Sequence, residues 1–124
     1  MDEKPIALCN SRDLLDGGLG IPFDVVYAGQ TCRAFAIRFR GLVYAYLNRC
    51  SHVAMELDFQ PNRFFDSSGQ FLICATHGAL YAPDTGRCKG GPGRGGLIPI
   101  ALSEIDGVIY WHTAYNLQAF EFPI

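Results

Sequence analysis

The chain has 124 residues, of which 49% are hydrophobic, a size that supports one compact core and is too short for two comfortable ones. Ten basic and twelve acidic residues leave a net charge of -2, and no cluster of Lys and Arg could follow a phosphate backbone, so nucleic acid is not an expected partner. No stretch reaches the roughly 18 uninterrupted apolar residues of a membrane helix, so a membrane is not expected either.

The N-terminal residues predict a cytoplasmic protein. They also predict a single turn of helix. The first ten residues have neither a signal-peptide layout nor a twin-arginine pair. Ser11 to Leu15 predicts one helical turn, with Ser11 as its cap and Gly17-Gly18 as its end. The next run, Phe23 to Tyr27, predicts a strand.

The segment from Gln30 to Leu47 predicts two strands that meet at Gly41. Alternation places Phe35, Ile37 and Phe39 on one face of the first strand and Arg38 and Arg40 on the other. A hairpin follows from this pattern.

The C-terminal part predicts further short strands separated by turns. The expected strands are Gln70 to Cys74, Leu97 to Leu102 and Val108 to Trp111, and the expected turns are Ser68-Gly69 and Asp106-Gly107. The stretch from Arg87 to Gly96 holds five glycines and Pro92, which predicts a loop and no regular strand. Short strands with Gly and Pro between them favour an all-β fold, an antiparallel sandwich or barrel.

We expect a single domain over residues 1–124, with its core at about 23–111. The tail at 113–124 is unusually apolar. It is expected to pack on the domain or on a second copy, and the second arrangement would make a homo-oligomer.

Five cysteines are an odd number, and cytoplasmic thiols stay reduced unless a metal takes them, so metal ligation is favoured over disulfides. Two short motifs, Cys50-Ser51-His52 and Cys74-Ala75-Thr76-His77, each follow a predicted strand and each supply one thiolate and one imidazole. Two such loops at one end of a sandwich can face each other across a metal. Ligand softness alone allows a zinc site or an iron-sulfur site. Finger-type zinc sites place their cysteines before their histidines, whereas here the two types alternate.

The order Cys-X-His, gap, Cys-X-X-His, in the contexts NRCSH and CATHGALYAPDTG, resembles the ligand signature of the Rieske iron-sulfur proteins, and the resemblance extends from about Phe23 to Trp111. It implies a Rieske-like antiparallel β-sandwich with a cluster-binding subdomain of two ligand loops. The implied cofactor is one 2Fe-2S cluster, with Cys50 and Cys74 on one iron and His52 and His77 on the other. The 21 residues between His52 and Cys74 are more than in the compact members of the family, which indicates an inserted turn at 61–68.

The resemblance also sets expectations for the reduction potential. Two imidazoles in place of two thiolates make the oxidised unit formally neutral, which raises its potential into a range of about -150 to +300 mV. High-potential members carry a serine where this chain has Ala79, and an extra cysteine in each ligand loop where this chain has Met55 and Thr76. A low to intermediate potential is therefore implied, raised somewhat by Tyr81, which those members share.

Other chemistry-bearing residues have simpler interpretations. Cys9, Cys32 and Cys88 are expected to be small fillers, and His112 a structural residue at a strand end. Pro92 is expected to belong to a loop that covers the cluster, as in Rieske proteins.

The histidine count bears on function. A ring-hydroxylating oxygenase needs a second iron site with two histidines and a carboxylate, whereas the chain has three histidines and the cluster would take two. The chain is therefore expected to be no enzyme but a Rieske-type ferredoxin, a single-electron carrier between a reductase and a terminal oxygenase or similar acceptor. The alternative is a tightly bound electron-transfer subunit of a larger oxidoreductase complex. A structural zinc-binding module is less favoured.

Overall fold

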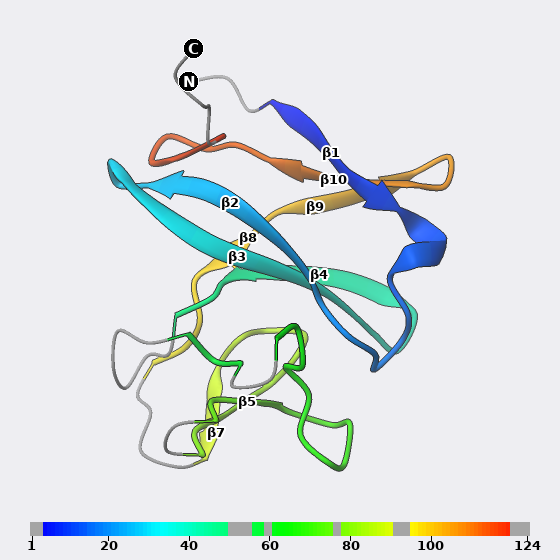
Figure 1. Ribbon diagram of the computed structural model, residues 1–124, viewed down its shortest axis with the longest axis vertical. Helices are drawn as coiled ribbons and strands as arrows, with labels where there is room; N and C mark the ends of the chain where they lie inside the picture. The colour runs from blue at the N-terminus through cyan, green and yellow to red at the C-terminus, as the bar shows by residue number, and fades with distance from the viewer. Residues whose placement is uncertain (1–3, 50–55, 59–60, 76–77, 91–94, 120–124) are drawn as a thin grey trace.

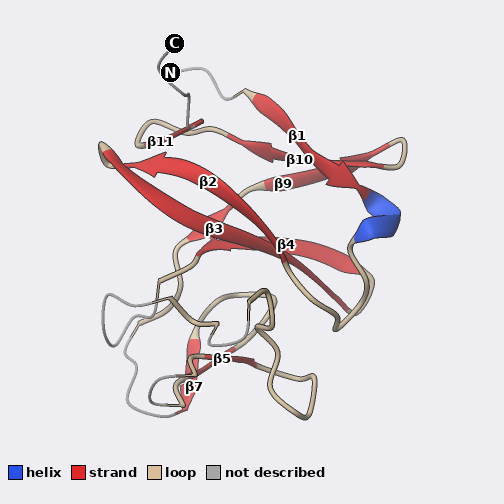
Figure 2. Ribbon diagram, in the orientation of Figure 1, coloured by secondary structure: helices blue, strands red, loops and turns tan. Residues whose placement is uncertain are grey.

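The computed structural model describes residues 4–49, 56–58, 61–75, 78–90 and 95–119. Its strands are β1 (Pro5–Asn10), β2 (Ile21–Tyr27), β3 (Gln30–Phe39), β4 (Leu42–Leu47), β5 (Leu72–Ile73), β6 (Leu80–Tyr81), β7 (Cys88–Gly90), β8 (Pro99–Ile100), β9 (Leu102–Ile105), β10 (Val108–His112) and β11 (Leu117–Ala119). Among the described residues the helical content is one 3₁₀ turn, Ser11–Asp13, and no helix there could span a membrane. The expected all-β class is confirmed, as Figure 2 makes visible.

Three antiparallel sheets are stacked along the long axis of the molecule (Figure 1). The central sheet has the strand order β11-β2-β3-β4-β8, and the upper sheet has the order β1-β10-β9. Below the central sheet lies what we call the loop layer, which consists of the small sheet β5-β6-β7 and the described segments 56–58 and 61–71.

The predicted hairpin at Gly41 is present and organises the central sheet. Phe39 pairs with Leu42, so Arg40 and Gly41 form a two-residue turn, and both have positive φ, 51° and 84°. Such a turn matches the right-handed twist of the strands, and it favours glycine at its second position. The carboxylate of Asp16 accepts hydrogen bonds from the backbone N–H groups of Arg40 and Gly41, at 3.0 and 2.6 Å.

The central sheet is buried on both faces. Toward the loop layer it presents large side chains, among them Phe35, Ile37 and Tyr46, which belong to one apolar cluster with residues of that layer, here called the lower core. Toward the upper sheet it presents side chains such as Ala34, Ala36 and Leu47, which belong to a second cluster, here called the upper core. Successive residues of a strand point to opposite faces, so β3 separates two cores rather than one core and solvent.

The inserted segment before Cys74 supplies aromatic side chains to the lower core. Phe64 and Phe65 are buried, and the Phe64 ring stacks on Phe35 with centroids 3.9 Å apart. The backbone N–H of Ile73 donates to the carbonyl oxygen of Phe64 at 2.9 Å. The predicted Ser68-Gly69 turn follows, and the N–H of Gly69 donates to the carbonyl of Asp66 at 3.0 Å. The insertion is therefore part of the packing beneath the ligand motifs.

Three sequence-based predictions need correction. The predicted strand from Leu97 to Leu102 is divided at Ala101 between β8 in the central sheet and β9 in the upper sheet. The predicted helical turn is a three-residue 3₁₀ turn whose cap position is Asn10 rather than Ser11, without a side-chain cap hydrogen bond. The stretch from Arg87 to Gly96, predicted to be loop throughout, includes strand β7, which pairs with β6 through a register shift.

Strands at both ends of the chain complete the sheets. β1 pairs with β10, and β11 pairs with β2. The apolar tail packs on the domain as far as it is described, because Leu117 is buried in the upper core, whereas residues 120–124 lie outside the described part.

Candidate metal centre

The described residues on the two sides of the first ligand motif are held together at the end of β4. The amide Oδ1 of Asn48 accepts a hydrogen bond from the backbone N–H of Leu57 at 2.7 Å, and its Nδ2 donates to Oδ1 of Asp58 at 2.8 Å. One side chain therefore connects the described residues before and after segment 50–55. That segment includes the predicted ligands Cys50 and His52, which lie outside the described residues.

The second ligand motif lies in the turn between β5 and β6. The backbone N–H of Cys74 donates to the carbonyl of Ala79, and the N–H of Gly78 donates to the carbonyl of Cys74, both at 2.9 Å. The Cys74 side chain is fully buried within the lower core. The predicted ligand His77 lies outside the described residues, as does Thr76.

A backbone hydrogen bond joins the second motif to the segment that follows the first. The N–H of Ala75, directly after Cys74, donates to the carbonyl of Leu57 at 2.9 Å. Leu57 follows the first ligand loop, and its side chain is completely buried. The described flanks of the two motifs therefore lie side by side, as a shared metal centre would require.

A third loop closes beside the second motif. The N–H of Cys88 donates to the carbonyl of Gly95 at 2.9 Å, and the N–H of Leu97 donates to the carbonyl of Gly86 at 2.8 Å. A Cβ on Gly96 would meet the Gly86 oxygen at 2.5 Å, so this close approach of two backbones requires glycine. Pro92, expected in a covering loop, is outside the described residues.

The surroundings of Cys74 are apolar and aromatic. Ala79 and Tyr81 are fully buried in the same cluster, and Cys88 packs against it. The hydroxyl of buried Tyr46 donates to the carbonyl of Pro83 at 2.8 Å. Burial raises the pKa of Tyr46 well above its ordinary range, and the charges of Asp84 and Tyr44 add to that effect, so its hydroxyl keeps its proton and remains a donor.

The donor set and its supports fit an iron-sulfur unit. A buried thiol on a tight turn in an apolar pocket suits a water-excluded soft metal centre, and the alternating thiol and imidazole donors belong to two loops with hydrogen-bonded flanks. The remaining described candidates are elsewhere. His112 is in the upper sheet, where its Nε2 is 2.7 Å from the Ser103 hydroxyl, and Cys9 and Cys32 are half-buried in β1 and β3. Within the described ranges no cluster of three or more metal-binding side chains occurs, and of the four predicted ligands these ranges include Cys74 alone.

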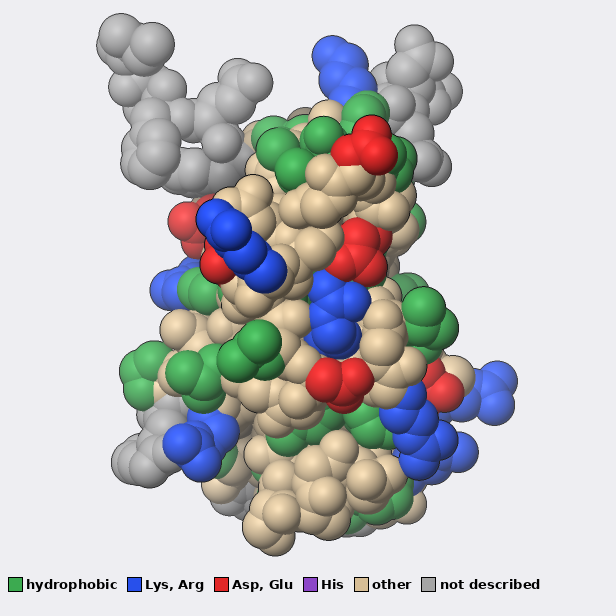
Figure 3. All heavy atoms as spheres, turned by 90° about the vertical axis from the view of Figure 1, so that its right-hand side faces the viewer, with side chains coloured by type: hydrophobic (Ala, Val, Ile, Leu, Met, Phe, Trp, Pro, Cys, Tyr) green, Lys and Arg blue, Asp and Glu red, His purple; other side chains and the backbone are tan. Residues whose placement is uncertain are grey.

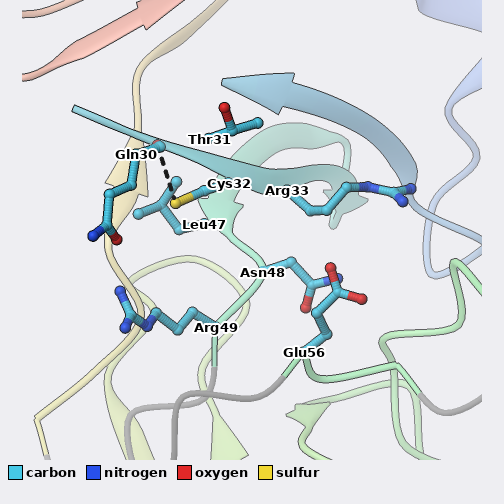
Figure 4. Close-up of a pocket in the computed structure, with 8 residues that line it drawn as sticks. All are labelled: Gln30, Thr31, Cys32, Arg33, Leu47, Asn48, Arg49 and Glu56. Carbon is cyan, nitrogen blue, oxygen red and sulfur yellow. Dashed lines mark hydrogen bonds between the residues drawn. The ribbon is translucent and has the colours of Figure 1, made fainter. Parts of the chain in front are cut away.

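A surface hollow of about 320 Å³ adjoins the first ligand loop (Figure 4). Its lining combines residues of β3 with the two described ends of that loop. Figure 4 shows that the Arg49 side chain extends away from Asn48, whereas the Glu56 side chain lies beside Asn48. The other face, drawn in Figure 3, carries Lys and Arg side chains interspersed with Asp and Glu, without a large patch of one sign.

Sequence reasoning overlooked Asn48 and Asp58. Both are short side chains that readily bond to nearby backbone groups, and both flank a loop with ligand-type residues. That combination was the available signal. What the sequence could not provide is their pairing, because the two residues are ten positions apart and meet only when the loop closes.

A family model of the Rieske [2Fe-2S] domain matches residues 4–117. A search of curated proteins returns no match. Among solved structures, the ferredoxin of carbazole 1,9a-dioxygenase from Nocardioides aromaticivorans IC177 is similar, with 22% identity and a TM-score of 0.69 over 87% of this chain and 96% of that one.

Two further structures show the same fold in other contexts. One is a chain of the complex of reduced oxygenase and oxidized ferredoxin in carbazole 1,9a-dioxygenase, with 20% identity, a TM-score of 0.66, and coverage of 86% of this chain and 91% of that one. The other is the terminal oxygenase of carbazole 1,9a-dioxygenase from Novosphingobium sp. KA1, with 20% identity and a TM-score of 0.66, where the match covers 98% of this chain and 31% of that one. The fold thus occurs as most of a small chain and as less than a third of a large one.

Proposed function

Because the chain belongs to the Rieske [2Fe-2S] domain family, we propose that it is a single-electron carrier that holds one 2Fe-2S cluster. Cys50 and Cys74 bind one iron, and His52 and His77 bind the other. Bound there, the cluster supplies reversible one-electron chemistry at a potential above that of all-cysteine clusters.

The observation that carries this proposal is the hydrogen bond from Ala75 to Leu57 beside the buried thiol of Cys74. It connects the described flank of one motif to that of the other, which supports one shared site for the four proposed ligands. The lower core excludes water from the Cys74 side. The chain's own residues thus bind, orient and shield the cluster.

The proposed partners are a reductase as electron donor and an oxygenase as acceptor. The similarity to a dioxygenase ferredoxin, which covers nearly all of that protein, supports a separate carrier. The histidine count supports the same role, since His112 is hydrogen-bonded in the upper sheet and leaves no pair of histidines for a second iron. We therefore propose a carrier and not an oxygenase.

A second candidate is a tightly bound electron-transfer subunit or domain of a larger oxidoreductase. It is favoured by the match that covers 31% of an oxygenase chain. Size-exclusion chromatography and pull-down from the native source distinguish the two. A carrier elutes as a monomer or weak dimer, whereas stoichiometric copurification with a larger chain would establish the subunit.

Chemical analysis of the purified protein tests the cluster itself. We expect about two iron and two acid-labile sulfide per chain, a coloured protein, and an electron paramagnetic resonance signal after reduction with dithionite. The variant His52→Cys should retain iron and lower the reduction potential, because a thiolate adds negative charge. A colourless protein with one zinc per chain would overturn the proposal.

A further inference from the structure

We propose that Asn48 is a positioning residue, which sets the first ligand loop against the second through Leu57 and Asp58; this rests on the function proposed above. The residues concerned, which we call the Asn48 network, are Asn48, Leu57, Asp58, Asn62 and Ala75. None of them is a proposed ligand.

Asn48 is itself fixed to the central sheet. Its backbone N–H donates to the carbonyl of Arg33 at 2.9 Å, directly beyond the last paired residue of β4. Its side chain then uses both amide atoms, with Oδ1 accepting from Leu57 at 2.7 Å and Nδ2 donating to Asp58 at 2.8 Å. The amide is therefore held in a single orientation, because reversing it would place a donor against a donor.

Two contacts extend the network to its neighbours. The carbonyl of Leu57 accepts from Ala75 at 2.9 Å, next to Cys74 in the second motif. The second carboxylate oxygen of Asp58 accepts from the N–H of Asn62 at 2.8 Å. A continuous series of hydrogen bonds thus runs from the central sheet through Asn48 and Leu57 to the second ligand motif.

This arrangement gives the amide an influence on both iron positions. Residues 49–56 include two proposed ligands, and Asn48 accepts a hydrogen bond from Leu57, the residue that follows this segment. Displacement of Leu57 would also remove the partner of Ala75. We therefore expect Asn48 to affect ligand geometry, and so the potential and the cluster lifetime, more than it affects the stability of the upper sheet.

An exchange of the two side chains provides the sharpest test. In Asn48→Asp the new carboxylate faces that of Asp58, so the two negative charges repel each other and their hydrogen bond is lost. In the double variant Asn48→Asp/Asp58→Asn, the carboxylate at 48 accepts from Leu57 and from the new amide, whose oxygen accepts from Asn62. All three hydrogen bonds are then restored, with donor and acceptor reversed only in the bond between the two side chains, and the net charge equals that of the wild type.

The measurements are made on the cluster-loaded protein at pH 8. We expect Asn48→Asp to lose visible absorbance at least tenfold faster than the wild type, with a shifted reduction potential and altered g values. Asp58→Asn should have a smaller effect, since the remaining amide oxygen can still accept from either Asn48 or Asn62 and no charge repulsion is created. The double variant should return to within threefold of the wild-type rate and to its potential.

Asn116→Asp is the matched control, because Asn116 is exposed in the turn before β11 and the variant adds the same charge far from the motifs. It should behave as the wild type. The inference is overturned if a cluster-bearing wild type and Asn48→Asp share one potential and one rate of absorbance loss, or if the double variant is no better than Asn48→Asp. A wild type without iron and sulfide would instead overturn the proposed function.

Discussion

The loop layer and the upper sheet are packed against the same central sheet but are built in different ways. In the upper sheet, β1, β9 and β10 have four to six residues each and pair over most of their length. In the loop layer, β5, β6 and β7 have two or three residues. Its order depends on turn hydrogen bonds, stacked aromatic rings and side chains such as Asn48 that bond to the backbone.

This difference indicates a division of roles. Strands that pair over many residues hold a sheet together with little contribution from any single side chain. Loops, in contrast, position metal ligands only if particular side chains hold the loops in place. Substitutions in the loop layer should therefore change both stability and the proposed cluster. Substitutions in the upper sheet should change stability alone.

The largest expected effect is loss of the cluster on removal of a buried ligand. Cys74→Ala should abolish the visible absorption and the iron content, because one iron would lose a thiolate at the centre of the loop layer. Cys32→Ala is the control, since Cys32 is half-buried in β3 and its thiol donates to the Gln30 carbonyl. Retention of a full cluster in Cys74→Ala would remove Cys74 from the site.

A pair of core truncations separates the two layers. Phe64→Ala and Trp111→Ala each remove a buried aromatic ring and should each lower the free energy of unfolding by about 3–5 kcal/mol, measured by chemical denaturation. Only Phe64→Ala should also shorten the cluster lifetime and shift the potential. If Trp111→Ala shifted the potential equally, the division between the layers would be wrong.

A smaller effect is expected from Tyr81, which is buried in the lower core. Tyr81→Phe should lower the reduction potential, because the family resemblance implies a hydrogen bond from this hydroxyl to a cluster sulfur, and such a bond favours the reduced state. Loss of one hydrogen bond of about 1 kcal/mol corresponds to roughly 40 mV for a one-electron couple. Redox titration of both proteins checks this, and Tyr44→Phe, on the neighbouring half-buried tyrosine of β4, is the control.

The smallest effect concerns an ion pair between the central and upper sheets. Both terminal nitrogens of Arg38 donate to the carboxylate of Glu104, and the shorter contact is 2.6 Å. The same guanidinium also donates to backbone carbonyls, Nε to that of Leu14 and a terminal nitrogen to that of Ser11. The hydrogen bond from Arg38 holds the pKa of Glu104 below its ordinary value of 4.5, with a further contribution from Ser11. The resulting stabilisation is present above that value and is lost as the pH falls through the lowered pKa of the folded state.

Glu104→Gln should therefore lower the free energy of unfolding by up to about 1 kcal/mol at pH 7, and the difference from the wild type should vanish in strongly acidic solution. Denaturant titrations across the pH range measure it, with the exposed Glu56→Gln as the control. The reduction potential should not change. A difference that grows as the pH falls would contradict the assigned ion pair.

The sequence was most informative where neighbours along the chain are also neighbours in space. The Gly41 hairpin follows from alternation and a turn signal, and both are local. The division at Ala101 could not be predicted, because Leu97 to Leu102 is one apolar run in the sequence. Its two parts nevertheless pair in different sheets. β1 was missed for a similar reason, since its pairing with β10 joins segments about a hundred residues apart.

The candidate site could be predicted from the sequence to a similar extent. The motif order predicted the family, and the buried position of Cys74 agrees with a ligand role, while Cys50, His52 and His77 stay predictions. The supporting side chains were not predicted. Asn48 has a recognisable role only once Leu57 and Asp58 are brought back to it, and that closure depends on the packing of Leu57 and on Ala75.

The two-sided burial of β3 limits how this site could be moved into another protein. Phe64, Leu72 and Tyr81 have no apolar layer of their own and are covered by Phe35 and Tyr46 of the central sheet. A graft of residues 48–98 onto a new scaffold would leave those side chains exposed to water. A designer would have to carry the β3–β4 hairpin with the loops, so the smallest transferable unit is a sheet and its loops together.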